Sequence, residues 1–329
     1  MARKLKGKTT SKGLKGALLR HQAQEQLNKK ITSKQEHAVK KNRPTKAVLN
    51  NQKIQRETAA KFIPFEKEST LLLIGEGDFS FARSIIENEY ISPANLVVTS
   101  YDNSPKELNL KYPKSFQQNY DFLMEHGTKV FFKIDATNLI KSFKLSKKTT
   151  WQKIVSSELA SKGLQNIMFN FPHTGKGIKD QDRNIRDHQE LILAFFRSSK
   201  EFFKQINQNL SSAILDKFAQ GYTLKSQENG TPASDSQGKV LISVFNGEPY
   251  DSWQIKILAK TSGWKVERSN KFQWENYPEY SHKRTNSEQE TTKPAAEREA
   301  RTFIFELYDK KKHAKNGKKS QNAGSDDEN

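Results

Sequence analysis

Residues 71–81 read LLLIGEGDFSF, and this stretch decides the fold. Residues 71–74 have the length and apolar character of a short buried strand, and Gly75-x-Gly77 follows as a turn into a second apolar segment. Glycine allows the backbone to approach a ligand closely, and a helix start offers free N–H groups. The stretch favours a nucleotide-type site in an α/β fold. A plain turn explains it equally well, since Ser80 replaces the third glycine of the dinucleotide fingerprint.

Strand-like and helix-like patterns alternate along the rest of the chain. We expect strands at residues 71–74, 96–99, 130–134, 167–169, 240–245, 264–266 and 303–307. Helices are expected at residues 81–86, 116–124, 151–159, 191–206 and 253–258. This alternation predicts a parallel sheet covered by helices on both faces.

Polar and glycine residues follow the expected strands at the edge where such sheets bind ligands. They are Gly75–Phe79, Asp102, Asp135, Asn170–His173 and Asn246–Glu248. This convergence is more specific than any one motif, and it predicts one ligand cavity at the carboxyl ends of the strands.

Two of these residues suggest an adenosine ligand. Asp102, directly after the second strand, can accept hydrogen bonds from a ribose diol, and Asp135, after the third, can accept from an adenine amine. Each alone is more often a turn-forming aspartate that accepts from a nearby backbone N–H. As a pair behind a glycine turn, they favour adenosine.

The sequence Asn170-Phe171-Pro172-His173 ends the fourth expected strand and predicts a rigid polar rim. An amide can hydrogen-bond the edge of a planar base, and an aromatic ring can stack on its face. Pro172 fixes the turn or simply ends the strand. The rim is similar to the Asn/Asp-Pro-Pro-aromatic rims of methyltransferases that modify planar nitrogen, but it differs at the second and fourth positions.

Residues 175–186 form a glycine-flexed, charged run beside this rim. It predicts a lid or a grip on RNA phosphates, although a surface loop leading into a helix has the same composition. The cations in question are Lys176, Lys179, Arg183 and Arg186.

Charge is unevenly distributed over the 329 residues. Residues 1–61 hold 17 Lys or Arg against three Glu, which leaves only +5 of the total net charge of +19 for the rest. Such an arm favours polyanions, nucleic acid above all, although a solvated targeting tail would look similar. We therefore expect a basic, disordered arm (residues 1–61), a folded body (62–308) with a loop insertion (221–238), and a disordered charged tail (309–329).

Several classes of site are disfavoured. The chain has no cysteine, which excludes thiol nucleophiles and cysteine-based metal sites. No histidine and carboxylate spacing predicts a metal site, and no phosphate-binding Gly-x-x-x-x-Gly-Lys-Ser/Thr motif occurs. No apolar run reaches the roughly 18 residues of a membrane span. We expect a nucleolar, monomeric protein without metal or membrane.

Four motifs together identify a family. The chain resembles the fungal nucleolar methyltransferases that modify uridine N3 in large-subunit (25S) rRNA, over roughly residues 69–308. The resemblance rests on Leu73–Phe81, Phe169–His173, Asp180–Arg186 and Tyr280–Thr285. It implies a Rossmann-like, seven-stranded methyltransferase sheet with a final antiparallel strand, S-adenosylmethionine as cofactor, and work on rRNA of the pre-60S particle.

The resemblance also implies roles for individual residues. The cofactor turn corresponds to Gly75, Glu76, Gly77 and Asp78. Beside these matched positions, we also expect Phe79, Ser80, Asp102 and Asp135 to bind the cofactor. The catalytic rim corresponds to Asn170–His173. For the proton that leaves N3, the candidates are His173, Asp180 and Asp182.

Two other functions stay open. A nicotinamide-dependent oxidoreductase uses the same kind of sheet, but the broken glycine fingerprint and the base-binding rim disfavour it. A non-catalytic, RNA-binding ribosome-assembly factor with a methyltransferase fold is disfavoured only by the rim.

Overall fold

The computed structural model describes residues 61–219, 238–285, 287–289 and 294–308. The chain divides into two units, Met1–Ala60 and Lys61–Asn329, and only the second contains described residues. The predicted arm (except Lys61), most of the 221–238 loop and the charged tail lie outside the described residues.

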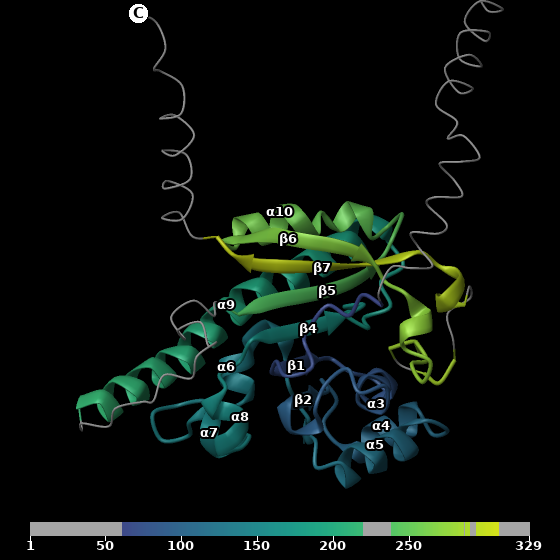
Figure 1. Ribbon diagram of the computed structural model, residues 1–329. Helices are drawn as coiled ribbons and strands as arrows, with labels where there is room; N and C mark the ends of the chain where they lie inside the picture. The colour runs from purple at the N-terminus through teal and green to yellow at the C-terminus, as the bar shows by residue number, and fades with distance from the viewer. Residues whose placement is uncertain (1–60, 220–237, 286, 290–293, 309–329) are drawn as a thin grey trace, which may run out of the picture. The chain divides into compact units, whose positions relative to one another are not determined.

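Seven strands form one sheet in the order β3-β2-β1-β4-β5-β7-β6. Their bounds are β1 (Leu71–Ile74), β2 (Leu96–Thr99), β3 (Lys129–Phe131), β4 (Asn166–Asn170), β5 (Lys239–Phe245), β6 (Trp264–Lys271) and β7 (Ala300–Leu307). The first five strands run parallel, and β7 is antiparallel to both β5 and β6 (Figure 1). The predicted sheet, with its reversed final strand, is confirmed.

Eight described α-helices surround the sheet. They are α3 (Ser80–Glu87), α4 (Pro105–Lys111), α5 (Phe116–Glu125), α6 (Leu139–Ser142), α7 (Trp151–Ile154), α8 (Ser157–Ser161), α9 (Gln181–Ala219) and α10 (Ile255–Thr261). Short 3-10 helices are η1 (Pro93–Asn95), η2 (Ala136–Asn138), η3 (Asp251–Trp253), η4 (Trp274–Asn276) and η5 (Ala295–Glu297). None of these helices is long and apolar enough to cross a membrane.

Alternate residues of β1 point into two separate cores, as strand geometry requires. Leu72 and Ile74 belong to the core that includes residues of α9 and α10, and Leu71 and Leu73 to the core that includes residues of α3, α4 and α5. Because β1 is apolar on both faces, it needs cover on both. In Figure 1, α3, α4 and α5 gather beside β1 and β2, whereas α10 lies along β6. This arrangement leaves the carboxyl ends of the parallel strands free for a site.

The element boundaries differ from the prediction in several places, among them the end of β3 at Phe131 rather than at residue 134. The helix expected at 191–206 begins ten residues earlier, because Asp180 accepts a hydrogen bond from the Arg183 N–H (2.8 Å) and caps it. The helix expected at 151–159 is two, because Ser156 caps α8 through the Leu159 N–H. The pattern did not predict α4, which Ser104 caps.

Candidate active site

A cavity of about 1300 Å³ opens at the carboxyl ends of the parallel strands. Residues after β1, β2, β3, β4 and β5 line it, together with the segment of residues 280–285 and with Arg298. The predicted Gly75–Asp78, Asp102, Asp135 and Asn170–His173 all take part. Asn246–Glu248 do not line it, so their predicted place in the site is wrong.

The glycine turn fits this cavity only because it lacks side chains. Gly75 has a φ of +68°, and a Cβ there would lie 2.8 Å from the Phe169 ring. A Cβ on Gly77 would lie 3.1 Å from the hydroxyl of Tyr112. The turn is tied to β2 by the Glu76 N–H, which donates to the carbonyl of Thr99 (2.9 Å). Backbone therefore forms this wall of the cavity, as close approach to a ligand requires.

Two buried carboxyl groups belong to the turn. Burial and the neighbouring Asp78 raise the pKa of Glu76 to about 8, against the opposing hydrogen bond from the Ala82 N–H. One oxygen of Asp78 accepts from the N–H (3.1 Å) and hydroxyl (2.7 Å) of Ser80. Its other oxygen, Oδ2, is buried without a partner. An unsatisfied carboxylate oxygen here favours a cationic ligand.

Phe79 and Ser80 support the turn from behind. Phe79 is fully buried in the core at a φ of 64°, and neither residue lines the cavity. Ser80 accepts the Ser281 N–H (3.2 Å) and holds Asp78 in place. Contact of Phe79 and Ser80 with the cofactor stays a prediction.

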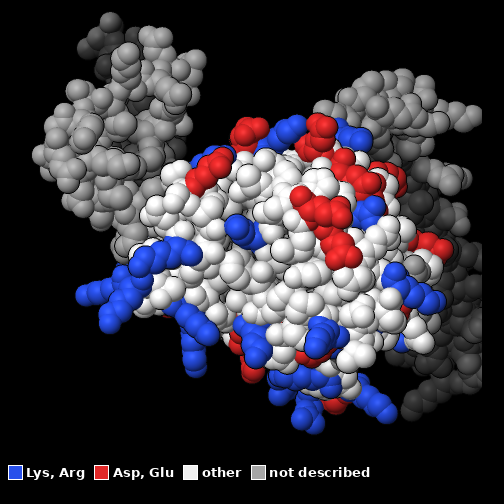
Figure 2. Space-filling view, turned by 90° about the horizontal axis from the view of Figure 1, so that it is seen from below, with Lys and Arg blue, Asp and Glu red and all other residues white. Residues whose placement is uncertain are grey.

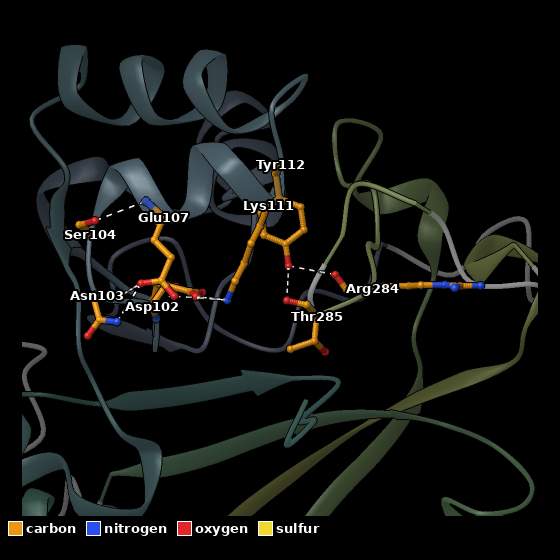
Figure 3. A network of polar contacts seen from close by, with 9 residues as sticks. Asp102, Asn103, Ser104, Glu107, Lys111, Tyr112, Arg284 and Thr285 are labelled. Atoms are coloured by element: carbon orange, nitrogen blue, oxygen red, sulfur yellow. Dashed lines mark hydrogen bonds and ion pairs between the residues drawn. The ribbon is translucent and has the colours of Figure 1, made fainter. Parts of the chain in front are cut away.

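Asp102 lines the cavity but is already paired. Its carboxylate forms an ion pair with Lys111 of α4 and accepts from the Ser100 hydroxyl (3.4 Å). Figure 3 shows Lys111 reaching from the helix toward Asp102, beside Glu107 and Asn103. A ribose diol at Asp102 would share this carboxylate with Lys111.

Asp135 caps a turn at the edge of the cavity. One of its oxygens accepts from the Thr137 N–H (2.8 Å) and hydroxyl (2.7 Å), which caps η2. The residue also lines the cavity. The turn-forming interpretation is confirmed, and contact with an adenine stays a prediction.

The rim after β4 has an unsatisfied amide at its centre. Both polar side-chain atoms of Asn170 are buried without a hydrogen-bond partner, although buried amides normally have several. Asn170 lines the cavity, and the next N–H, of Phe171, donates to Ser243 of β5 (2.8 Å). Phe171 has a φ of 48°, a strained conformation for a residue with a side chain. Such strain is typical of functional sites.

Phe171 packs within an aromatic cluster at the cavity wall. Its ring lies 4.5 Å from Phe245, 4.8 Å from His282 and 5.5 Å from Trp274, centroid to centroid, and is parallel to Trp274. The cluster holds the ring rigidly. Stacking of Phe171 on a base stays a prediction.

Two histidines near the rim have lowered pKa values. The pKa of His173 is lowered by partial burial and by His188, and its Nδ1 accepts from the Gly175 N–H (2.9 Å). Burial and the charge of Arg298 lower the pKa of His282 to about 4. The Tyr280 hydroxyl lies 2.9 Å from Nδ1 of His282. Burial raises the pKa of Tyr280 well above its ordinary value.

Residues 279–285 follow β6 and precede β7 in the sequence, and they close one side of the cavity. We call this segment the strap. The Tyr112 hydroxyl lies 2.9 Å from the carbonyl oxygens of both Arg284 and Thr285, as Figure 3 shows. At the other end, the Glu279 carboxylate accepts hydrogen bonds from the hydroxyl of Ser84 in α3 and from the amide of Asn88, which caps the end of α3 (both 2.7 Å). The strap is thus fastened to helices at the opposite end of the sequence.

The charged run after the rim lies partly outside the cavity. Lys176 lines the cavity and pairs with Asp187. The other cations, Lys179, Arg183 and Arg186, are exposed and do not line it. Asp180 caps α9, and Asp182 is exposed on its first turn. Of the three predicted proton acceptors, only His173 lines the cavity.

Sequence reasoning missed Lys111, Tyr112 and Arg298, all of which line the cavity. The signal for α4 was present, since Ser104, Pro105 and Glu107 form a helix-start pattern. Nothing local marks Arg298, which the fold alone brings to the site.

Comparisons with known proteins agree with this geometry. Residues 72–284 match the family described as BMT5-like, rRNA (uridine-N3-)-methyltransferase BTM5-like. A Saccharomyces cerevisiae (strain ATCC 204508 / S288c) protein named 25S rRNA (uridine(2634)-N(3))-methyltransferase is 52% identical over 340 residues, which cover 99% of this chain and 100% of that protein. The chain belongs to this family. The predicted resemblance is confirmed, and the chain is a methyltransferase.

More distant matches cover smaller shares of this chain. An uncharacterized Arabidopsis thaliana protein is 26% identical over 238 residues, which cover 71% of this chain and 91% of that protein. Among solved structures, a putative methyltransferase from Thermoplasma acidophilum is 10% identical, with a TM-score of 0.33 and 77% of each chain covered. The family assignment rests on the closer matches, and methyltransferases of this kind imply S-adenosylmethionine as methyl donor.

Proposed function

We propose that this protein methylates N3 of a uridine in large-subunit rRNA during ribosome biogenesis, with S-adenosylmethionine as donor. The observation that carries the proposal is one cavity that joins an acidic glycine turn to the unsatisfied amide of Asn170. The relative named for this reaction is 52% identical over nearly the whole chain.

The cofactor half of the cavity comprises the residues after β1, β2 and β3. S-adenosylmethionine carries an ammonium and a sulfonium group, and the unpartnered Oδ2 of Asp78 beside Glu76 suits a cation. Gly75 and Gly77 have no side chains, so the cofactor has room to approach the backbone of the turn closely. When bound, it supplies an activated methyl group, so the protein chiefly positions the base and excludes water.

The substrate half comprises the residues after β4 and β5. The free donor and acceptor of Asn170 match the edge of a pyrimidine, which presents both. Because N3 is buried in a base pair, the enzyme must take an unpaired uridine or flip one out. The exposed Lys179, Arg183 and Arg186 would hold the adjoining phosphates.

The basic arm of residues 1–61 would supply further phosphate contacts and a nucleolar address. On the face of the folded body drawn in Figure 2, Lys and Arg project mainly along the lower and left margins, and acidic side chains gather toward the upper right. That face is not uniformly basic, which leaves the arm a large share of RNA attraction. We expect a monomer that acts on the pre-60S particle. Among the described residues, no cluster of metal-ligating side chains occurs.

The test is mass spectrometry of rRNA nucleosides from cells that lack the protein. We expect N3-methyluridine to disappear from the large-subunit rRNA and to return with the wild-type protein. An unchanged modification profile alongside a defect in ribosome assembly would instead support a non-catalytic assembly factor.

A further inference from the structure

Arg298 lies in the cavity wall immediately before β7. Its guanidinium carbon is 3.5 Å from the centroid of the Phe245 ring, and its Nη2 donates to the Tyr250 hydroxyl (3.0 Å). Its carbonyl lies 3.4 Å from the Trp274 indole nitrogen, which donates to it. The side chain is half-buried and held on a fixed aromatic surface, as the wall of a binding site requires.

The charge of Arg298 is not balanced by the protein. Within the described part of the chain, no carboxylate lies in ion-pair range of its guanidinium, whereas Arg83, Lys111 and Lys176 are each paired with one. A guanidinium has five N–H donors, and Tyr250 accepts from only one group of them. The remaining donors can serve a ligand that carries or develops negative charge.

Sheet register places Arg298 in the same half of the cavity as Asn170. Asn170 pairs with Ser243 on β5, and Phe245 pairs with Ala300 on β7, two residues after Arg298. The Phe245 ring lies 4.5 Å from Phe171. Of the carboxylates of the cavity, Glu76, Asp78, Asp102, Glu107 and Asp135 follow β1, β2 and β3, whereas Asp187 and Glu190 lie on α9, which follows β4. The cation therefore lies where the base would enter.

Methylation at uracil N3 develops such a negative charge. Loss of the N3 proton leaves an anion whose charge is shared between N3 and the two carbonyl oxygens. Only in this form does N3 have an in-plane lone pair that can attack a methyl group. We propose that Arg298 donates hydrogen bonds to a carbonyl oxygen of the target uracil and stabilises its N3-deprotonated form. The inference rests on the proposed function. The proton passes to water, N3 bonds to the methyl carbon, and the carbon–sulfur bonding pair stays on sulfur.

Other titratable groups near Arg298 are few. Tyr250 contacts it, and His282 and His173 lie nearby. The pKa of His282 is held at about 4, so it stays neutral above pH 6, and that of His173 is lowered as well. A loss of methylation in Tyr250→Phe without one in Arg298→Met would point to the tyrosine instead, and it would overturn the proposal.

Short RNA with 5-fluorouridine at the target position tests this directly, since fluorine makes N3 more acidic and reports its ionisation by ¹⁹F NMR. In complexes with S-adenosylhomocysteine, we expect the wild-type protein to lower the apparent pKa of N3 below that of free RNA. Arg298→Met should restore the free value, and Arg298→Lys should lie between. Equal values in all complexes would overturn the proposal.

Methylation rates add a second readout. Arg298→Met should lose about 10²-fold on uridine RNA, as for removal of one donor to a developing anion, and clearly less on 5-fluorouridine RNA. Arg268→Met is the matched control, because Arg268 also lies over a ring (Phe62, 5.8 Å) but outside the cavity. Equal losses on both RNAs would show a structural role for Arg298. No methylation by the wild-type protein on either RNA would instead refute the proposed function.

Discussion

At the scale of single residues, the site depends on what is absent from Gly75 and Gly77 and on what is buried at Glu76 and Asp78. The absent side chains leave room at the turn, while the buried carboxyl groups make its floor acidic. Both features are visible in the sequence, but the unpartnered oxygen of Asp78 and the raised pKa of Glu76 appear only in the folded chain.

Gly77→Arg should abolish cofactor binding and leave the fold intact. The new side chain would start 3.1 Å from the Tyr112 hydroxyl and enter the cavity, where there is space for it but not for ligand as well. Calorimetric titration with S-adenosylmethionine measures the effect, and circular dichroism checks the fold. Unchanged affinity would refute the place we give to the turn.

Glu76→Gln should stabilise the free protein in a pH-dependent way. The folded pKa of about 8 exceeds the ordinary 4.5, so the folded protein keeps a proton that the unfolded chain releases between these values. The contribution of Glu76 to wild-type stability is therefore greatest below pH 4.5 and falls as the pH rises to about 8. Glutamine does not titrate, and its advantage should approach the order of 4 kcal/mol near pH 8.

Urea denaturation at pH 5 and pH 8 checks this prediction. A variant that differs from the wild-type protein by the same free energy of unfolding at both values would show that Glu76 is not held protonated.

At the scale of elements, the strap between β6 and β7 is hydrogen-bonded to the helices that follow β1 and β2. Tyr112 is one of its anchors, because its hydroxyl proton is shared between two carbonyl oxygens of the strap. The strap lines the cavity, so its position decides how fully the cavity is enclosed.

Tyr112→Phe should loosen the strap while keeping the ring against Gly77. We expect a loss of about 1 kcal/mol in the free energy of unfolding. Cofactor affinity should fall, and residues 279–285 should exchange amide hydrogen faster. Tyr90→Phe is the control, since the Tyr90 hydroxyl contacts only Lys61 among the described side chains and lies outside the cavity. Equal exchange in Tyr112→Phe and wild-type protein would contradict this role for the strap.

Elements also show how far the sequence predicts the structure. All seven strands were predictable, and the clearest were short apolar runs such as residues 71–74 and 240–245, which are buried on both faces. The residues that follow those strands were predictable as site residues for the same reason. Arg298 and Tyr112 were not, because contacts between residues far apart in the sequence depend on sheet order and on packing. Asp180 caps α9, and helix capping alone selects aspartate at a helix start, so a role of Asp180 or Asp182 as proton acceptor stays a prediction.

At the scale of the whole molecule, charge is divided between the arm and the body. Residues 1–61 carry a net +14 of the total +19, while the cavity of the body is acidic on its cofactor side. We infer that the arm attracts RNA broadly and that the cavity selects the base.

Removal of residues 1–61 should separate these two functions. The affinity for large-subunit RNA should fall, and its dependence on salt should become less steep, because fewer counterions are released. The affinity for S-adenosylmethionine should not change. Fluorescence titrations of labelled RNA at several salt concentrations measure the RNA affinity and its dependence on salt. An unchanged salt slope would show that the arm does not contact phosphates.

The central claim is that the glycine turn and the Asn170 rim form one active site for methylation of uridine N3. The most direct test uses large-subunit rRNA from cells that lack this protein. The rRNA is incubated with the purified protein and isotope-labelled S-adenosylmethionine, and its nucleosides are then measured by mass spectrometry. The account predicts labelled N3-methyluridine with the wild-type protein and its loss in Asn170→Ala, whose cofactor affinity stays normal. Label in another nucleoside, or full activity of Asn170→Ala, would contradict it.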